Sequence, residues 1–153
     1  MVNSSYANLT GVISIVAHIV VIERDEHLAM QMTSALEAAG YRVEIVTDPA
    51  EGLRTFYQAN PDLVILAEEL PKVDGEDTCL RIRRASYLPI IVIGSKQKAV
   101  EALEHGVDAY INRPPDLDEL IARVRALLRH KPSSNPQETN SKKESTDAGS
   151  STT

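Results

Sequence analysis

Two hydrophobic periods alternate along most of the chain. Short apolar runs rich in β-branched residues predict strands at His18–Ile22, Tyr41–Val46, Leu63–Leu66, Pro89–Ile93 and Ala109–Ile111. Between these runs, apolar residues recur three and four positions apart, as on one face of a helix. Strands that alternate with helices predict an α/β domain, with a five-stranded parallel sheet and helices on both of its faces.

The predicted helices carry start and stop signals. A helix over Glu26–Ala39 ends at Gly40, and Asp48-Pro49 begins a helix that stops at Asn60-Pro61. The other helices are expected over Glu76–Arg84, with Cys79, Leu80 and Ile82 partly buried, over Lys96–His105, closed by Gly106, and after the capping residue Asp116. These signals fix where each strand and its following helix meet.

The two ends of the chain differ from its centre in composition. No Leu, Ile, Val, Met or aromatic residue follows Leu128, so residues 131–153 predict a disordered Ser/Thr-rich tail or linker. A flexible leader is expected over residues 1–11, and the folded domain over residues 12–130. The apolar segment Val12–Ala17 fits an extension of the first strand, an extra edge element or an artefact of an upstream start.

Composition excludes several classes of protein. The 153 residues include 16 Lys+Arg and 22 Asp+Glu, a net charge of −6, which argues against direct nucleic-acid binding. Cys79 is the only cysteine, so neither an internal disulfide nor a multi-cysteine zinc site can form. The apolar stretch Gly11–Ile22 is far shorter than the ~20 residues of a membrane span and lacks signal-peptide flanks, so we expect a cytoplasmic protein.

In an open parallel sheet, ligands bind outside the carboxyl ends of the strands, where the strand order reverses. The residues that follow the predicted strands are therefore the candidates for a site. They are Glu23, Arg24 and Asp25; Ala67, Glu68 and Glu69; Gly94 and Ser95; and Asn112, Arg113 and Pro114.

From His18 to His130 the sequence resembles a response-regulator receiver domain. The stretches that carry the resemblance are IVVIERDE, PDLVILAEELPKVDG, LPIIVIGSK, GVDAYINRPPDLDEL and LIARVRALLRH, in family order and near family spacing. The resemblance implies a flavodoxin-like, doubly wound sheet of strand order 2-1-3-4-5. It also implies magnesium-dependent phosphoryl transfer from a histidine kinase onto an aspartate at the end of the third strand.

Several positions depart from the pattern that this chemistry needs. The resemblance aligns Ala67 with the phosphoacceptor aspartate, and a methyl group cannot form an acyl phosphate. Strand alternation turns Glu68 to the opposite face, and Glu69 starts from a different backbone position. Gly94 stands at the Ser/Thr position, and the segment from Gly94 to Gly106 is about three residues shorter than in the family, a comparison that rests on the resemblance alone.

The charges of the aligned pocket have changed as well. The family's acidic pair appears as Glu23 and Arg24, and Arg113 replaces the lysine before Pro114. Too few oxygen ligands remain for magnesium, so we expect no metal and no cofactor. Arg24 or Arg113 is expected to pair with Glu23 or Glu69. Outside the family frame, the segment from Glu23 to Asp25 fits a solvated strand end equally well.

The resemblance also points to an interaction face. Tyr110 keeps the aromatic switch residue, and Glu119 and Arg123 match positions that form salt bridges across a dimer of helix 4, strand 5 and helix 5. Ala99 and Ala109 occupy the positions of their usual partners, so only half of the residues of that salt-bridge network are present. We expect an atypical pseudo-receiver without enzymatic activity, which contacts another signalling protein of unknown identity.

Two other functions remain open at this point. The vacated crevice could hold a small ligand and make the chain a sensor. Alternatively, the chain could be the regulatory domain of a transcription factor whose DNA-binding domain is absent here. No nucleophile–base pair and no Gly-rich phosphate loop supports an enzyme.

Overall fold

The computed structural model describes residues 5–7, 13–74 and 76–129. Its centre is a parallel sheet of five strands: β3 (His18–Ile22), β4 (Arg42–Val46), β5 (Leu63–Ala67), β6 (Ile90–Gly94) and β7 (Ala109–Asn112). They lie in the order β4-β3-β5-β6-β7, with every neighbouring pair parallel. The predicted order 2-1-3-4-5 is confirmed, and it reverses between β3 and β5.

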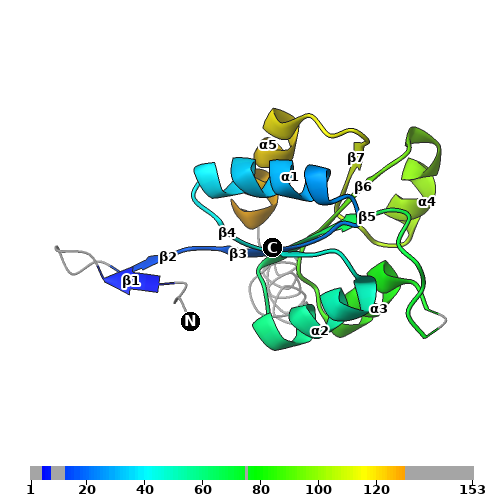
Figure 1. The fold of residues 1–153 in the computed structure, drawn as a ribbon, viewed down its shortest axis with the longest axis horizontal. Coiled ribbons are helices and arrows are strands. Elements are labelled where there is room, and N and C mark those ends of the chain that lie inside the picture. Colours follow the sequence, from blue (N-terminus) through cyan, green and yellow to red (C-terminus); the bar gives the residue numbers. More distant parts are fainter. Residues whose placement is uncertain (1–4, 8–12, 75, 130–153) are drawn as a thin grey trace, which may run out of the picture.

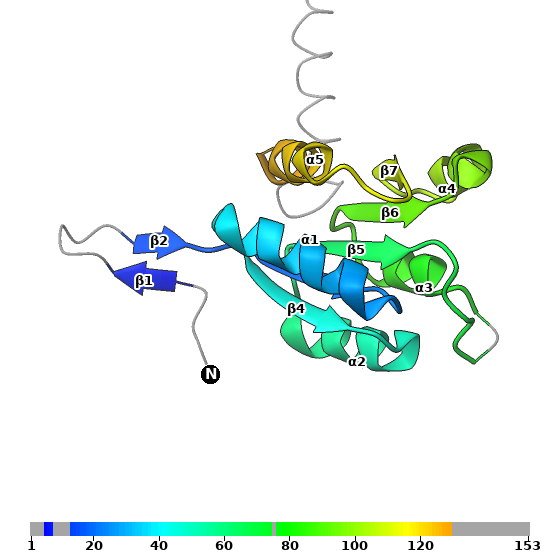
Figure 2. The ribbon, with the colours of Figure 1, turned by 45° about the horizontal axis from the view of Figure 1, so that its top comes forward.

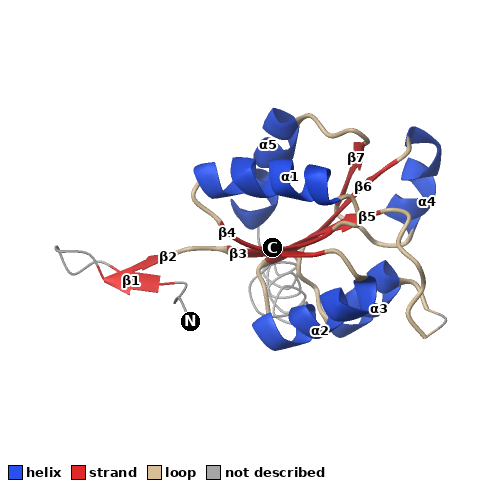
Figure 3. Ribbon diagram, in the orientation of Figure 1, coloured by secondary structure: helices blue, strands red, loops and turns tan. Residues whose placement is uncertain are grey.

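Helices cover both faces of the sheet (Figures 1 and 3). On one face lie α1 (Glu26–Ala38) and α5 (Leu117–Arg129), and on the other α2 (Pro49–Ala59) and α3 (Thr78–Ala85). The six-residue α4 (Ala99–Glu104) lies beside β6 and β7. The predicted caps Asp48 and Asp116 form, because their side chains accept backbone N–H groups of the first turn of α2 and α5. Asp25, which was not predicted as a cap, does the same for α1.

Alternate residues of the buried strands contribute to two hydrophobic clusters, one on each face. On the α1 and α5 side, Ile19 and Val21 of β3 pack with Met32 and Leu36 of α1. On the other side, Val20 and Ile22 of β3 pack with residues of α2 and α3. The sheet is thus buried on both faces, as the continuous apolar runs of its strands predict.

Three local predictions need correction. The segment predicted as one helix over Lys96–His105 is a 3₁₀ turn at Lys96–Lys98 followed by α4. The helix predicted over Glu76–Arg84 begins only at Thr78, since Asp77 caps it. Leu80 is exposed rather than partly buried. Thr78 and Ile82, four residues apart, form the buried face of α3, and Leu80 lies half a turn away from both.

Two short strands precede the five-stranded sheet. β1 (Ser5–Ala7), within the leader expected to be flexible, pairs antiparallel with β2 (Ile13–Ile15) in a separate two-stranded sheet. β1 is not predicted, whereas β2 lies in the apolar segment Val12–Ala17, for which an extra edge element is one of three interpretations. This sheet projects away from the domain (Figure 2). The tail expected over residues 131–153 lies outside the described residues. Among the described helices, none combines the length and apolar character needed to cross a bilayer.

Candidate functional site

The carboxyl ends of β3, β5, β6 and β7 enclose a crevice of about 620 Å³. The six residues that the sequence predicts for the altered phosphorylation pocket all line this crevice, although they follow four different strands. They are Glu23, Arg24, Ala67, Glu69, Gly94 and Arg113. The crevice lies beside the point where the strand order reverses, which is the ordinary ligand position of this fold.

A buried ion pair lies inside this crevice. Glu23 is only 2% exposed, and its Oε1 accepts hydrogen bonds from Arg113 Nη2 at 2.7 Å and Nη1 at 3.2 Å. Its Oε2 accepts a hydrogen bond from the backbone N–H of Asp25 at 2.9 Å. A buried carboxylate is tolerated when it is paired and hydrogen-bonded in this way. The predicted pairing is confirmed for Arg113 with Glu23.

The other predicted charges do not join this pair. Arg24 and Glu69 are exposed, and neither forms a salt bridge with another described residue. Asp25 caps α1, with its Oδ1 3.1 Å from the N–H of Leu28. The sequence offers two arginines and two glutamates, but strand β7 places Arg113 opposite Glu23.

The residues of the crevice do not suit magnesium. A magnesium site needs several free oxygen ligands in a near-octahedral arrangement. Both oxygens of Glu23 already accept hydrogen bonds, and Ala67, at the end of β5, carries no oxygen in its side chain. Across the described part of the chain, no three His, Cys, Asp or Glu side chains are arranged to hold a metal. We therefore derive no step through a metal ion.

Gly94 allows two side chains to come close to the backbone of β6. The hydroxyl of Tyr110 donates a hydrogen bond to the carbonyl oxygen of Ser95, and Oε1 of Glu68 accepts one from the N–H of Ser95 at 3.0 Å. A β-carbon at position 94 would overlap both Tyr110 and Glu68. The absent side chain of Gly94 is therefore a condition for this arrangement.

The surroundings of Tyr110 also affect its ionisation. Burial raises the pKa of the Tyr110 hydroxyl above its usual range, and the negative charge of Glu68 raises it further. The phenol therefore remains a hydrogen-bond donor at neutral pH. This keeps the bond to the carbonyl of Ser95 in place.

Glu68 was not among the predicted pocket residues. Strand alternation predicts that Glu68 points away from the pocket, but it lines the same crevice as Ala67, and its carboxylate reaches the loop after β6. Its Oε2 is buried without a hydrogen-bond partner among the described residues. The only sequence signal for this role was a charged residue directly after a buried strand, beside a glycine on the neighbouring strand.

The predicted interaction face is built from α4, β7 and α5. Glu119 and Arg123 are both exposed on α5 and lie near one another, with 3.8 Å between Arg123 Nη2 and Glu119 Oε2. Tyr110 is half-buried on β7. Val100 and Leu103 of α4 are 68% and 50% exposed, which adds apolar surface to the charged residues. No other described part of the chain therefore covers this surface.

Comparisons with known proteins agree with this architecture. The family model described as the response regulator receiver domain matches residues 19–125. The response regulator ArlR of Staphylococcus saprophyticus is 37% identical over 120 residues, which cover 76% of this chain and 54% of the relative. The regulator RpaA of Synechocystis, described as a DNA-binding dual master transcriptional regulator, is 37% identical over 117 residues, which cover 72% of this chain and 48% of the relative. The chain spans about half the length of these curated relatives.

Solved structures show the same fold. A putative response regulator from Chloroflexus aurantiacus superposes with a TM-score of 0.69 at 26% identity, covering 75% of this chain and 99% of the other. The N-terminal receiver domain of RstA from Klebsiella pneumoniae, solved in a BeF3-activated form, gives 0.67 at 27% identity, covering 74% and 99%. The similarity extends over the five-stranded domain.

Proposed function

Because the chain belongs to the response-regulator receiver family, we propose that it acts in two-component-type signal transduction as a protein–protein interaction module that needs no phosphorylation. The observation that carries this proposal is Ala67 at the carboxyl end of β5. There the resemblance expects the phosphoacceptor aspartate. A methyl group has no oxygen to attack a phosphoryl donor, so the module has no reaction of its own.

The other changes in the crevice support the same proposal. Arg113 neutralises the buried Glu23 without a metal ion. Tyr110 donates a hydrogen bond to the carbonyl of Ser95 and lies where a side chain at position 94 would be, so its orientation is set by this hydrogen bond and by packing. A receiver with these features has one resting arrangement of the crevice. Its signalling state is then set by which partner is present.

We further propose the face of α4, β7 and α5 as the contact surface, around Tyr110, Glu119 and Arg123. The exposed apolar residues of α4 support this choice, because a contact surface commonly combines an apolar centre with a charged rim. The partner is another signalling protein in the cytoplasm. A homodimer through the same face is the alternative occupant, and direct contact with nucleic acid or membrane is not part of the proposal.

The first test is phosphorylation. The chain is incubated with acetyl phosphate and magnesium, and its intact mass is measured. We expect no added phosphoryl group, whereas a homologous receiver with the aspartate gains one under the same conditions. The variant Ala67→Asp is also expected to react poorly, because Arg24 and Gly94 remain unsuited. A hydroxylamine-labile phosphoryl adduct on the unmodified chain would overturn the proposal.

The second test concerns the contact face. The charges of Glu119 and Arg123 are exchanged, and partner capture is compared with that of a variant in which Glu51 and Arg54 are exchanged. The second pair is also an exposed ion pair, but it lies on α2. We expect weaker capture only for the α5 variant, at nearly equal thermal stability. Equal capture by both variants would place the contact surface elsewhere.

A second candidate function has one observation in its favour. The chain spans about half of relatives such as RpaA, whose description includes DNA binding. The domain would then be the regulatory part of a transcription factor. Under this alternative, we expect that this chain, when fused to a DNA-binding domain, regulates the DNA binding of the fusion protein through the α4, β7 and α5 face. A DNA mobility shift with the fusion and with its α5 exchange variant distinguishes the two candidates.

A further inference from the structure

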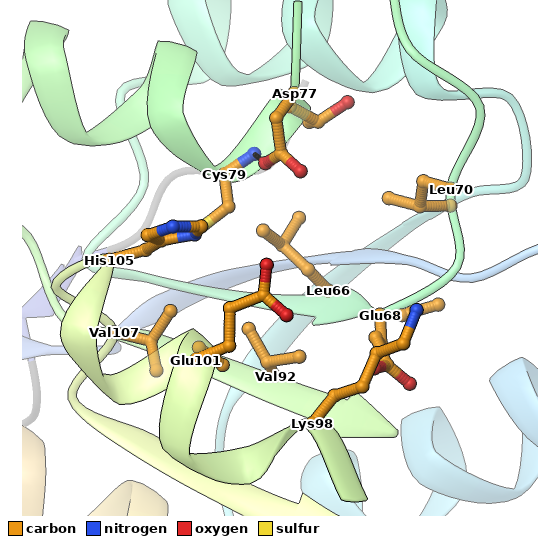
Figure 4. Close-up of a pocket in the computed structure, with 13 residues that line it drawn as sticks. Leu66, Glu68, Leu70, Asp77, Cys79, Val92, Lys98, Glu101, His105 and Val107 are labelled. Atoms are coloured by element: carbon orange, nitrogen blue, oxygen red, sulfur yellow. Dashed lines mark hydrogen bonds between the residues drawn. The ribbon is translucent and has the colours of Figure 1, made fainter. Parts of the chain in front are cut away.

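The helix α4 contacts the rest of the domain through small side chains. Ala99 and Ala102 are half-buried, and the other residues of this helix are exposed. A pocket of about 150 Å³ remains between α3 and α4, with Cys79 of α3 and Glu101 of α4 on opposite sides of it (Figure 4). Because a helix of six residues is not stable in water by itself, α4 needs a further attachment to stay in one place.

One arginine of α3 attaches the C-terminal end of α4. The Nε of Arg83 donates a hydrogen bond to the carbonyl oxygen of Gly106 at 3.1 Å, in the turn that follows α4. The Nη2 of the same side chain donates to Oδ2 of Asp108 at 2.7 Å, directly before β7. The guanidinium group suits such a bridge, because its donors point in fixed directions. A residue of a different helix therefore holds the end of α4.

The guanidinium group of Arg83 is itself fixed on its other side. Its Nη1 donates hydrogen bonds to the carbonyl oxygens of Leu88 at 2.9 Å and Ser86 at 3.3 Å, in the loop between α3 and β6. The Oδ2 of Asp108 also accepts a hydrogen bond from the backbone N–H of Ile90 at 2.8 Å, at the start of β6. Arg83 thus joins α3 and the loop before β6 to the turn after α4 and the start of β7.

The turn at Gly106 brings its carbonyl oxygen within reach of Arg83. Gly106 has a φ angle of 94°, and its N–H donates to the carbonyl oxygen of Leu103 at 3.1 Å. This is a common way for a helix to end at glycine. A β-carbon at position 106 would lie 3.7 Å from Nε of Arg83, so the arginine side chain packs directly against this turn.

We propose that Arg83 is a positioning residue that holds α4 in place, and that α4 opens as a separate unit when the hydrogen bonds of Arg83 break. An element with few buried contacts opens at a lower free energy than the whole domain unfolds. The inference goes beyond the proposed function and does not depend on it, because every contact involved lies within this chain. For the α4, β7 and α5 face, it means that α3 controls where Val100 and Leu103 lie.

The test is backbone hydrogen exchange of the full chain, followed residue by residue by two-dimensional NMR. The amides of His105 and Gly106 bond to carbonyl oxygens of α4 and report its opening. The amide of Ile65, on the buried central strand β5, reports global unfolding. In the unmodified chain we expect His105 and Gly106 to be protected, but less than Ile65. Equal protection of all three amides, or exchange of His105 and Gly106 as fast as in an unstructured chain, would overturn the proposal.

The variant Arg83→Ala tests the role of the arginine. If its hydrogen bonds must break before α4 can open, exchange at His105 and Gly106 becomes about tenfold faster or more. Gly40 ends α1 in a turn that also has a positive φ angle, and its amide is expected to change by less than about twofold. Faster exchange at Ile65 with unchanged exchange at His105 and Gly106 would mean that Arg83 only stabilises the whole domain, and would overturn the proposal.

Two further variants complete the test. Arg84→Ala removes the neighbouring arginine, which is 65% exposed and pairs with Glu76. We expect it to change exchange at His105 and Gly106 by less than about twofold. Arg83→Lys keeps the charge and most of the stem, so it serves if Arg83→Ala does not fold. One ammonium group cannot replace the fixed fork of donors, so we expect exchange about threefold faster or more at the same two amides. Equal acceleration by Arg84→Ala and the Arg83 variants would mean a general effect of charge on α3 and would overturn the proposal.

Discussion

The two faces of the central sheet carry helices of very different packing. On one face, α1 buries Leu28, Ala29, Met32 and Leu36 against the strands. On the other, α4 buries no residue, and a pocket of about 150 Å³ remains beside it. The three central strands between the two faces are buried along their whole length, since every residue of β3, β5 and β6 is buried.

This difference originates in the helices and not in the sheet. The 13 residues of α1 repeat apolar residues at intervals of four, at Leu28, Met32 and Leu36, so that one continuous stripe contacts the sheet. The six residues of α4 complete less than two turns, and its large side chains Val100 and Leu103 face outward. The helix α1 is therefore fixed along its length, whereas α4 leaves space beside it on a face where α2 and α3 are packed.

The largest expected effect comes from two matched leucine substitutions. Leu36→Ala on α1 removes a fully buried side chain and is expected to lower the free energy of unfolding by about 2–5 kcal/mol. Leu103→Ala on α4 removes a side chain that is 50% exposed and is expected to change it by less than about 0.5 kcal/mol. Urea unfolding followed by circular dichroism measures both. Similar losses for the two variants would contradict the difference between the faces.

The second largest loss of stability is expected when the ion pair at the carboxyl edge of the sheet is broken. Arg113→Ala leaves the buried carboxylate of Glu23 without its cation and is expected to cost about 2–3 kcal/mol. This is less than for a fully buried pair, because the side chain of Arg113 is 36% exposed.

The double variant Glu23→Gln with Arg113→Ala is the control for this pair. It removes the charge that the single variant leaves unpaired, so its loss is expected to be smaller than that of Arg113→Ala alone. Chemical denaturation of the unmodified chain, the single variants Arg113→Ala and Glu23→Gln, and the double variant under one set of conditions gives the coupling free energy. Strictly additive losses would mean that the two side chains do not interact.

Larger side chains should change the stability of the protein in opposite directions on the two faces. Ala29→Leu places a larger side chain at a position on α1 that is 1% exposed, and a loss of about 1.5 kcal/mol is expected from overpacking. Ala102→Leu on α4 adds the same atoms beside the pocket and is expected to stabilise by about 0.5–1 kcal/mol. Thermal unfolding measures both changes. Destabilisation by both would mean that the pocket cannot accept a side chain.

The last prediction concerns a reaction rate and not stability, at Cys79 in the wall of the pocket. Burial raises the pKa of its thiol from 9.0 to about 11, and the negative charge of Asp77 contributes in the same direction. Because only the thiolate reacts, alkylation by iodoacetamide at pH 8 is expected to be about 100-fold slower than in the urea-unfolded chain. The rate should rise about tenfold for each pH unit up to about pH 10. A rate equal to that of the unfolded chain would contradict the burial of the thiol.

The sequence predicts the sheet well for a physical reason. Buried parallel strands are nearly continuous apolar runs, so His18–Ile22 is predicted with the bounds that β3 has. Helix ends marked by Asp48, Gly40 and Gly106 are also predicted, because capping is local and both glycines have positive φ angles, 101° and 94°. The strand β1 is missed and β2 is left among three interpretations of Val12–Ala17, since their pairing depends on a contact between two separate segments.

The sequence predicts which residues form the crevice but not how their side chains pair. Strand ends identify the residues of the crevice, because parallel strands end at one edge. Which arginine pairs with Glu23 depends on side-chain directions at two strand ends that are 90 residues apart. The role of Glu68 and the pocket beside α4 depend on three-dimensional packing that no periodicity encodes.

The close approach at Gly94 has an evolutionary consequence. A serine or threonine at this position would overlap Tyr110 and Glu68, so it becomes acceptable only after both side chains move. An aspartate at position 67 would gain little while Arg24 and Gly94 remain. Under the proposed function, a return to phosphorylation would therefore require several substitutions that are unfavourable one at a time. We expect descendants of this chain to keep a small residue at position 94 even where the rest of the crevice varies.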